Sequence, residues 1–270
     1  MRIGSLDFDK IQGPHIMGIL NTTPDSFSDG GRFLLPEAAL ERGLAIAREG
    51  GHLIDIGGES TRPGASYVDA EEEMRRILPA IRSLKAAGSL PISVDTYKAS
   101  VAAAALEAGA DMINDVTGLW GDPDMARVVG ESGVPVCIMM NRRLMEPTGD
   151  IFKDLDGFFR KSLDLAEKAG IREDSIILDP GIGFGLEARE SFQILHHLER
   201  LREYGMPILL GASRKRIIWQ TLGVRPEEAL AGTLATTALG VFKGADIIRV
   251  HDVAENVKCA LVANEIRKNQ

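Results

Sequence analysis

The chain has 270 residues, of which 31 are basic and 39 acidic, giving a formal net charge of −8, and 44% are apolar. The apolar content excludes an intrinsically disordered chain, and the negative charge argues against a surface devoted to nucleic acids or other polyanions. The two cysteines, Cys137 and Cys259, lie far apart in the sequence, so neither a disulfide framework nor a thiolate zinc site is indicated.

Eight short apolar runs punctuate the chain and predict buried β-strands. In chain order they cover residues 16–20, 52–56, 91–94, 112–115, 134–140, 176–178, 207–210 and 246–250. Between them, segments with helical periodicity predict amphipathic helices, clearest at residues 36–50, 70–88, 98–109 and 124–132. Gly50, Gly109 and Gly244 stand where a helix would end shortly before the next strand. This alternation predicts an α/β protein with a parallel sheet covered by helices.

Eight such units could form a closed barrel or an open, doubly wound sheet. An open sheet is expected to bind phosphates at one glycine-rich turn, whereas here polar residues follow nearly every strand. No linker or low-complexity segment interrupts the series. We therefore predict a single (β/α)8 TIM-barrel domain over residues 1–270.

Polar side chains follow strand after strand in this prediction. Each has a plainer explanation when taken alone: Asp95 could cap the next helix, Asn114 could form a turn, and Asp179 could start one with Pro180 and Gly181. In a barrel, however, the carboxyl ends of all strands form one rim, so these residues are expected to converge on one pocket.

The residue types at this rim predict its ligand. Carboxylates and an amide can recognise the donors and acceptors of an aminopyrimidinone ring, and Arg and Lys match oxyanions. The first group comprises Asp95, Asn114 and Asp179, and the cationic group comprises Arg62, Lys215, Arg249 and His251. Residues 213–216 would ordinarily form a solvated basic face, but after an apolar strand we expect Lys215 to point into the rim. The pocket suits a heterocycle carrying a phosphate, with diphosphate as a leaving group.

Several common catalytic motifs are absent from the sequence. It contains no G-x-x-x-x-G-K-[ST], G-x-S-x-G or H-E-x-x-H, so P-loop, serine-hydrolase and zincin mechanisms are not indicated. Residues 1–20 mix charged with apolar side chains, unlike a signal peptide, and no run reaches the roughly 18 apolar residues of a membrane span. We expect a cytoplasmic protein.

The sequence resembles the dihydropteroate synthase family along nearly its whole length. The most specific segments are GILNTTPDSFSDGG at 18–31 and IDIGGESTRPG at 54–64. The match extends through SVDT at 93–96, INDV at 113–116, LDPGIGFG at 178–185, SRK at 213–215 and RVH at 249–251. The resemblance implies a TIM barrel, usually a homodimer, that joins 6-hydroxymethyl-7,8-dihydropterin diphosphate to p-aminobenzoate with Mg²⁺, a step of folate synthesis and a target of sulfonamides.

The resemblance also implies roles for individual residues. Those implied as catalytic are Asp25, Asp29, Asp95, Asp179 and Lys215, and Asn21 is implied as the Mg²⁺ ligand. Those implied to bind the substrates are Phe27, Thr61, Arg62, Pro63, Asn114, Phe184, Ser213, Arg214, Arg249 and His251. Departures from common family residues stand at Met140, Leu186, Arg216 and Trp219.

Residues 22–32 and 59–66, after the first two predicted strands, contain glycines and prolines, and we expect them to form mobile loops that close over the rim. Two other functions stay open at this point. A methyltetrahydrofolate:corrinoid methyltransferase would share the pterin residues without needing the cations for a diphosphate. A non-catalytic pterin-binding paralogue would keep the fold and lose the turnover.

Overall fold

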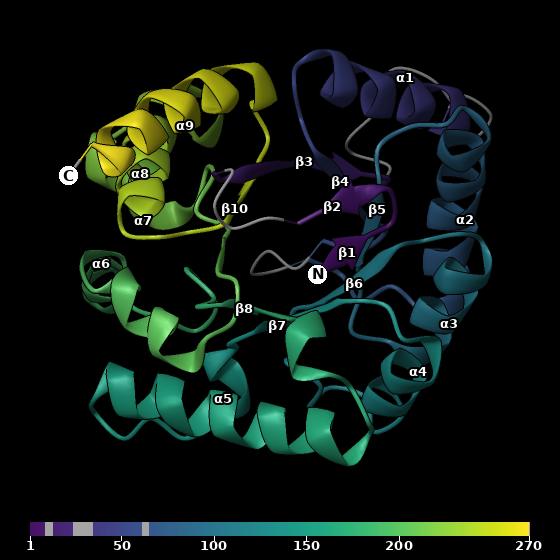
Figure 1. The fold of residues 1–270 in the computed structure, drawn as a ribbon, viewed down its shortest axis with the longest axis horizontal. Coiled ribbons are helices and arrows are strands. Elements are labelled where there is room, and N and C mark those ends of the chain that lie inside the picture. Colours follow the sequence, from purple (N-terminus) through teal and green to yellow (C-terminus); the bar gives the residue numbers. More distant parts are fainter. Residues whose placement is uncertain (9–12, 24–34, 61–64, 270) are drawn as a thin grey trace.

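The computed structural model of this chain describes residues 1–8, 13–23, 35–60 and 65–269 (Figure 1). Eight parallel strands follow one another in the order β8-β7-β6-β5-β4-β3-β10-β9, and a parallel bridge between Leu178 and Ile208 joins the two ends. The strands are β3 (His15–Asn21), β4 (Leu53–Gly57), β5 (Ile92–Asp95), β6 (Met112–Asp115), β7 (Val136–Met139), β8 (Ile176–Asp179), β9 (Leu209–Leu210) and β10 (Ile247–Val250). All eight predicted strands are present, and the (β/α)8 barrel is confirmed.

The helices form a ring around the barrel, as Figure 1 shows. They are α1 (Leu35–Arg48), α2 (Ala70–Ala86), α3 (Ala99–Glu107), α4 (Met125–Ser132), α5 (Ile151–Lys168), α6 (Ala188–His196), α7 (Arg216–Leu222), α8 (Leu230–Phe242) and α9 (Val253–Lys268). Short 3-10 helices occur at Arg142–Leu144, Glu173–Ser175, Leu198–Tyr204 and Pro226–Glu228. Local sequence explains where helices begin: the Asp69 side chain accepts a hydrogen bond from the backbone N–H of Glu72 at the start of α2.

A short antiparallel hairpin precedes the barrel, formed by β1 (Arg2–Ile3) and β2 (Leu6–Asp7). It was not among the predicted elements. Ile3 and Phe8 pack into the apolar cluster inside the barrel, so this hairpin covers the amino-terminal end of the strands.

The apolar core has two separate layers because strand side chains alternate between the two faces of a sheet. The outer layer lies between strands and helices and includes Ile54, Val94 and Ile248. The inner layer fills the barrel beneath its rim with Met17, Leu53, Met112, Cys137, Ile177, Leu209 and Ile247, all fully buried. The barrel is therefore packed at one end and carries its polar residues at the other.

Two predictions concern parts of the chain that the structure describes only at their ends. Of the loops expected at residues 22–32 and 59–66, residues 24–32 and 61–64 lie outside the described residues.

Within the described ranges, no helix is both long and apolar enough to cross a bilayer.

Candidate active site

The period of two along each strand puts polar side chains into the barrel directly above the inner apolar layer. Counting two residues on from Leu53, Met112, Ile177 and Ile247 gives Asp55, Asn114, Asp179 and Arg249. Asp95 joins them from β5, where it is paired in register with Gly57 on one side and Asn114 on the other. The predicted convergence of residues from different strands is present.

Arg249 lies between two carboxylates. Its Nε donates to Oδ2 of Asp55 (2.6 Å), and its Nη2 donates to Oδ2 of Asp95 (2.7 Å). The Asn114 side-chain amide donates to the same Asp55 oxygen (3.2 Å). Side chains from β4, β5, β6 and β10 thus form one network at the rim.

Asp179 and Lys215 form the other side of the rim. Asp179 accepts a hydrogen bond from the backbone N–H of Gly181 (2.7 Å), and a Cβ atom on Gly211 would lie 3.5 Å from its Oδ2 and 3.9 Å from Cδ of Arg249. Asp179 is therefore close to Arg249. The Lys215 ammonium lies 4.2 Å from the centre of the Phe184 ring, and its stem passes over Gly183. Lys215 points into the rim, as the sequence predicted.

The site shifts the pKa values of its charged groups. Burial raises the pKa of Asp95 to about 7 and that of Asp179 to about 6, even though Arg249 and Lys215 attract both carboxylates. Burial, together with the nearby Arg249, lowers the pKa of Lys215 to about 8. Burial also disfavours the charged form of Arg249, but Asp55 and Asp95 outweigh this and raise its pKa. Carboxyl groups that titrate near neutrality in such a setting are typical of a functional site.

Asn21 is the last residue of β3, and His251 directly follows β10. A Cβ atom on Gly57 would lie 3.8 Å from Oδ1 of Asn21 and 3.9 Å from Oδ2 of Asp95, so both side chains lie close to Gly57. The Ser213 hydroxyl lies 3.0 Å from Nδ1 of His251 and accepts a hydrogen bond from the His251 backbone N–H (3.3 Å). Asn21 at the end of β3, Ser213 after β9 and His251 directly after β10 therefore extend the polar rim.

Arg214, another predicted site residue, forms an ion pair with Asp252. The guanidinium of Arg214 pairs with Asp252, with Nε 3.1 Å from Oδ2 and Nη2 2.5 Å from Oδ1, and its role in substrate binding stays a prediction. Six residues predicted for the site lie outside the described residues: Asp25, Phe27, Asp29, Thr61, Arg62 and Pro63.

Sequence reasoning did not select Asp55 as a site residue. Asp55 is fully buried and holds Arg249 and Asn114 through one oxygen. The available signal was an acidic residue inside an apolar strand, at the interior position between Leu53 and Gly57.

Comparisons with known proteins find similar chains along nearly the whole length of this one. A family model described as pterin binding enzyme matches residues 17–251. The chain is 46% identical to the dihydropteroate synthase of Clostridium beijerinckii, over 98% of this chain and 99% of that protein. A crystal structure of dihydropteroate synthase from Clostridium difficile in the presence of pteroic acid is similar with a TM-score of 0.94 and 47% identity, covering 96% of this chain and 99% of that one. The Xanthomonas albilineans dihydropteroate synthase with 4-aminobenzoic acid gives a TM-score of 0.91 at 44% identity, covering 95% and 94%.

Proposed function

This chain belongs to the family of pterin-binding enzymes, and we propose that it is a dihydropteroate synthase. It joins 6-hydroxymethyl-7,8-dihydropterin diphosphate to p-aminobenzoate and releases 7,8-dihydropteroate and pyrophosphate. The observation that carries this proposal is the meeting of Asp95, Asn114 and Asp179 with Lys215 at one rim of the barrel. The cytoplasmic location stays a prediction from the sequence.

The pterin ring is held by complementary hydrogen bonds. The carboxylates of Asp95 and Asp179 accept from ring and amino N–H groups, and the Lys215 ammonium donates to the ring carbonyl. The Asn114 amide nitrogen is turned toward Asp55, which leaves its carboxamide oxygen as the acceptor for the ligand. Two carboxylates, one amide and one ammonium thus match the alternating donors and acceptors of the heterocycle.

The reaction follows a dissociative path in this proposal. The bond between the exocyclic methylene carbon and the diphosphate oxygen breaks first, and its electron pair leaves with the diphosphate. The electron-rich dihydropterin spreads the positive charge, which ionised Asp95 and Asp179 favour electrostatically in their buried setting. The amine nitrogen of p-aminobenzoate then forms the new C–N bond and loses a proton.

Arg249 and His251 hold the leaving diphosphate. A guanidinium carries five N–H donors, and Asp55 and Asp95 each take one of them in Arg249. The Asp55 contact fixes the direction of the guanidinium, so Arg249 is oriented before a substrate arrives. His251 is positioned by Ser213.

The rim also fits the proposed Mg²⁺. Asn21 Oδ1 lies near Gly57 at the rim, and Mg²⁺ in proteins uses one or two side-chain oxygens together with waters and substrate phosphates. No group of three or more His, Cys, Asp or Glu suited to a metal occurs among the described residues. Asn21 is the proposed protein ligand. When bound, the ion would neutralise charge on the diphosphate.

A turnover assay tests the function directly. Purified protein mixed with the pterin diphosphate, p-aminobenzoate and Mg²⁺ should form dihydropteroate and pyrophosphate in equal amounts, and sulfonamides should compete with p-aminobenzoate. Methyl transfer from methyltetrahydrofolate to a corrinoid, with no pyrophosphate formed, would support the methyltransferase instead. Pterin binding without any turnover would support a non-catalytic paralogue.

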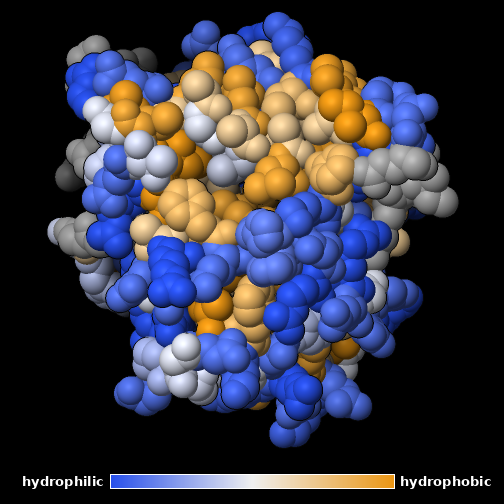
Figure 2. Space-filling model, turned by 90° about the vertical axis from the view of Figure 1, so that its left-hand side faces the viewer, coloured by the Kyte–Doolittle hydropathy of each residue, from blue (hydrophilic) through white to orange (hydrophobic). Residues whose placement is uncertain are grey.

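We further propose that the chain forms a homodimer through the outer face of α8 and α9. Large apolar side chains on this face are 37–63% exposed: Leu239, Phe242, Leu261, Val262 and Ile266. A cavity of about 500 Å³ lined mainly by such side chains lies on the same face. Figure 2 shows extensive apolar surface in the upper half of this side of the molecule.

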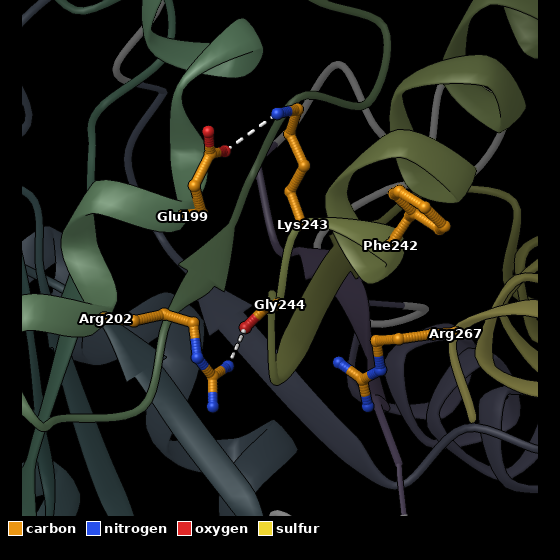
Figure 3. Close-up of a pocket in the computed structure, with 6 residues that line it drawn as sticks. All are labelled: Glu199, Arg202, Phe242, Lys243, Gly244 and Arg267. Atoms are coloured by element: carbon orange, nitrogen blue, oxygen red, sulfur yellow. Dashed lines mark hydrogen bonds and ion pairs between the residues drawn. The ribbon is translucent and has the colours of Figure 1, made fainter. Parts of the chain in front are cut away.

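Polar groups border this apolar face. Phe242 also lines a neighbouring cavity of about 410 Å³, in which Lys243 pairs with Glu199 (2.8 Å) and Arg202 donates to the Gly244 carbonyl (2.9 Å), as Figure 3 shows. Arg267 approaches this cavity from α9. An apolar centre with a polar border is the usual anatomy of an interface, and an apolar face complements its own copy across a twofold axis.

A measurement of the oligomeric state in solution tests the proposed dimer. Sedimentation should show a dimer for the unchanged chain and a monomer for the Val262→Glu, Ile266→Glu double variant. Leu222→Glu is the matched control, because Leu222 is 46% exposed on α7 and does not line the α8–α9 cavity. A wild-type monomer at assay concentrations would contradict the proposal.

A further inference from the structure

A tight turn between β9 and α7 carries two polar residues of the rim. The backbone N–H of Lys215 donates to the Ala212 carbonyl (3.1 Å), which closes a β-turn with Ser213 and Arg214 at its centre. The Ser213 and Lys215 side chains both belong to the rim described above. The shape of this turn therefore decides where two site residues point.

Arg214 holds the turn in a backbone conformation that residues with a side chain rarely adopt. Its φ is 54°, in the left-handed region. Glycine is the usual residue at the third position of a β-turn when φ is positive there, because a Cβ atom comes too close to the neighbouring carbonyl oxygen. Leu119 is the one other non-glycine residue with a positive φ in the described part of the chain. The surroundings of Arg214 must therefore compensate for an unfavourable local conformation.

Two side chains hold the turn from outside it. The backbone N–H of Arg214 donates to the hydroxyl of Thr233 on α8 (3.2 Å), and Thr233 is fully buried. The Arg214 guanidinium makes a bidentate contact with the Asp252 carboxylate, and the two side chains are only 28% and 21% exposed. A bidentate pair fixes the direction between its partners as well as their distance.

Asp252 is itself firmly placed. It directly follows His251, and its backbone carbonyl accepts from the backbone N–H (3.2 Å) and the side-chain amide (2.6 Å) of Asn256. Asn256 is fully buried on α9 and accepts a hydrogen bond from the hydroxyl of Thr237 on α8 (2.7 Å). The carboxylate that binds Arg214 is thus anchored on two packed helices.

Two successive residue pairs join the turn to the end of β10. Ser213 contacts His251, and the next residue, Arg214, contacts Asp252. Rotation about the N–Cα bond of Arg214 to a negative φ would swing the chain that follows, which begins with Lys215. Relaxation of the turn would therefore move Lys215 away from the rim.

We propose that Arg214 and Asp252 are positioning residues for the pterin diphosphate. Their ion pair stabilises the left-handed turn, which directs Lys215 at the ring and keeps Ser213 against His251. Arg214 acts through these neighbours and touches neither substrate. The inference rests on the proposed function, since Lys215 and His251 are the groups proposed to bind the pterin diphosphate.

Two substitutions of Arg214 separate positioning from direct contact with a substrate. Arg214→Ala and Arg214→Gly both remove the guanidinium, but of the two only glycine adopts a positive φ freely. In Arg214→Ala the fraction of protein with the competent turn should fall, so the Kd of the pterin diphosphate, measured by calorimetry, should rise at least about fivefold. Arg214→Gly should recover most of that loss. Equal weakening in both variants would indicate direct contact and overturn the positioning role.

Replacing Asp252 tests the other partner. Asp252→Asn keeps the size of the side chain and the backbone contacts with Asn256, but it gives up the charge and one acceptor of the bidentate contact. Alone, it should raise the Kd about as much as Arg214→Ala does. Combined with Arg214→Gly, it should change the Kd by less than about twofold, because the ion pair is already absent. Equal effects in the two backgrounds would show that Asp252 acts independently of Arg214, against the proposal.

A surface pair supplies the matched control. Arg172 pairs with Asp174 ahead of β8, whereas the rim lies at the carboxyl ends of the strands, and the two side chains are 78% and 61% exposed. Arg172→Ala should therefore leave the Kd unchanged. Urea unfolding accompanies each binding measurement, and a lower stability with an unchanged Kd in Arg214→Ala would assign a purely structural role. If Arg214→Ala does not fold, Asp252→Asn in the two backgrounds carries the test.

The possible results distinguish the inference from the function beneath it. A wild-type protein that makes no dihydropteroate overturns the proposed function and this inference with it. Normal turnover by wild type, together with wild-type pterin affinity in Arg214→Ala, overturns the positioning role alone.

Discussion

The guanidinium of Arg249 is held by Asp55, a fully buried carboxylate whose Oδ2 lies 2.6 Å from Arg249 Nε. The two residues are 194 positions apart and come from β4 and β10, the strands on either side of β3. Because the same oxygen also binds Asn114, Asp55 orients a cation and an amide of the site together.

Replacing Asp55 should therefore damage stability and ligand binding together. Asp55→Asn keeps the size of the side chain but leaves Arg249 with one carboxylate, and breaking a buried pair typically costs about 3–5 kcal/mol. Urea unfolding should show a loss near the lower end of that range, and calorimetry should show weaker pterin binding. Asp7→Asn is the control, since its partner Arg2 and Asp7 itself are 71% and 77% exposed, and it should unfold like wild type. Equal behaviour of the two variants would remove Asp55 from the network.

Replacing Asp179 should affect the ligand more than the fold. Asp179→Asn loses a charge-assisted hydrogen bond to the pterin, which is typically worth about 1.5–3 kcal/mol, or about tenfold or more in affinity. The variant keeps an oxygen that can accept from the Gly181 N–H, so the turn after β8 should survive. Calorimetry with a pterin ligand measures the loss, and an unchanged Kd would exclude Asp179 from the pterin site.

The shifted pKa values predict a bell-shaped pH profile. Asp95 and Asp179 must be ionised to accept from the ring, so kcat/KM for the pterin substrate should rise through about pH 6 to 7. It should fall again near pH 8 as Lys215 loses its proton. A profile flat from pH 5 to 9 would speak against these assignments.

The same groups predict how the stability of the ligand-free protein depends on pH. Because the pKa values of Asp95 and Asp179 are raised in the folded state, the folded state binds more protons than the unfolded state between pH 3.8 and about 7. Their contribution to the free energy of unfolding is therefore present at low pH and is lost as the pH rises through this window. Chemical denaturation at several pH values, compared between wild type and Asp95→Asn, measures the contribution. An identical pH dependence in the two proteins would contradict it.

A dissociative reaction predicts bond breaking without the amine. With the pterin diphosphate and Mg²⁺ alone, labelled pyrophosphate should exchange into the substrate, because the C–O bond breaks before p-aminobenzoate reacts. The control omits the protein. Exchange that appears only when p-aminobenzoate is present would favour direct displacement.

The barrel could be predicted because each strand is a short apolar run with its own place in the alternating pattern. Residues 112–115 show this best, since predicted and observed strands coincide. The β1–β2 hairpin escaped prediction because strands of two residues carry no measurable periodicity.

The site could be predicted only where position along a strand decides the outcome. Asp95, Asn114 and Asp179 follow apolar runs, and a barrel brings such ends together. Contacts between particular side chains depend on neighbours far away in the sequence, which is why the pairing of Arg214 with Asp252 and that of Lys98 with Glu59 could not be read from their surroundings.

The inner apolar layer beneath the rim limits the direction from which ligands can reach the site. Ile3 and the inner layer are fully buried, so a molecule seated on Asn114 and Asp179 can be reached from one side only. A ligand bound at the bottom of the site must enter before a ligand that lies above it, and it can leave only after that ligand has left. We therefore expect ordered kinetics, in which the ligand bound deepest binds first and leaves last.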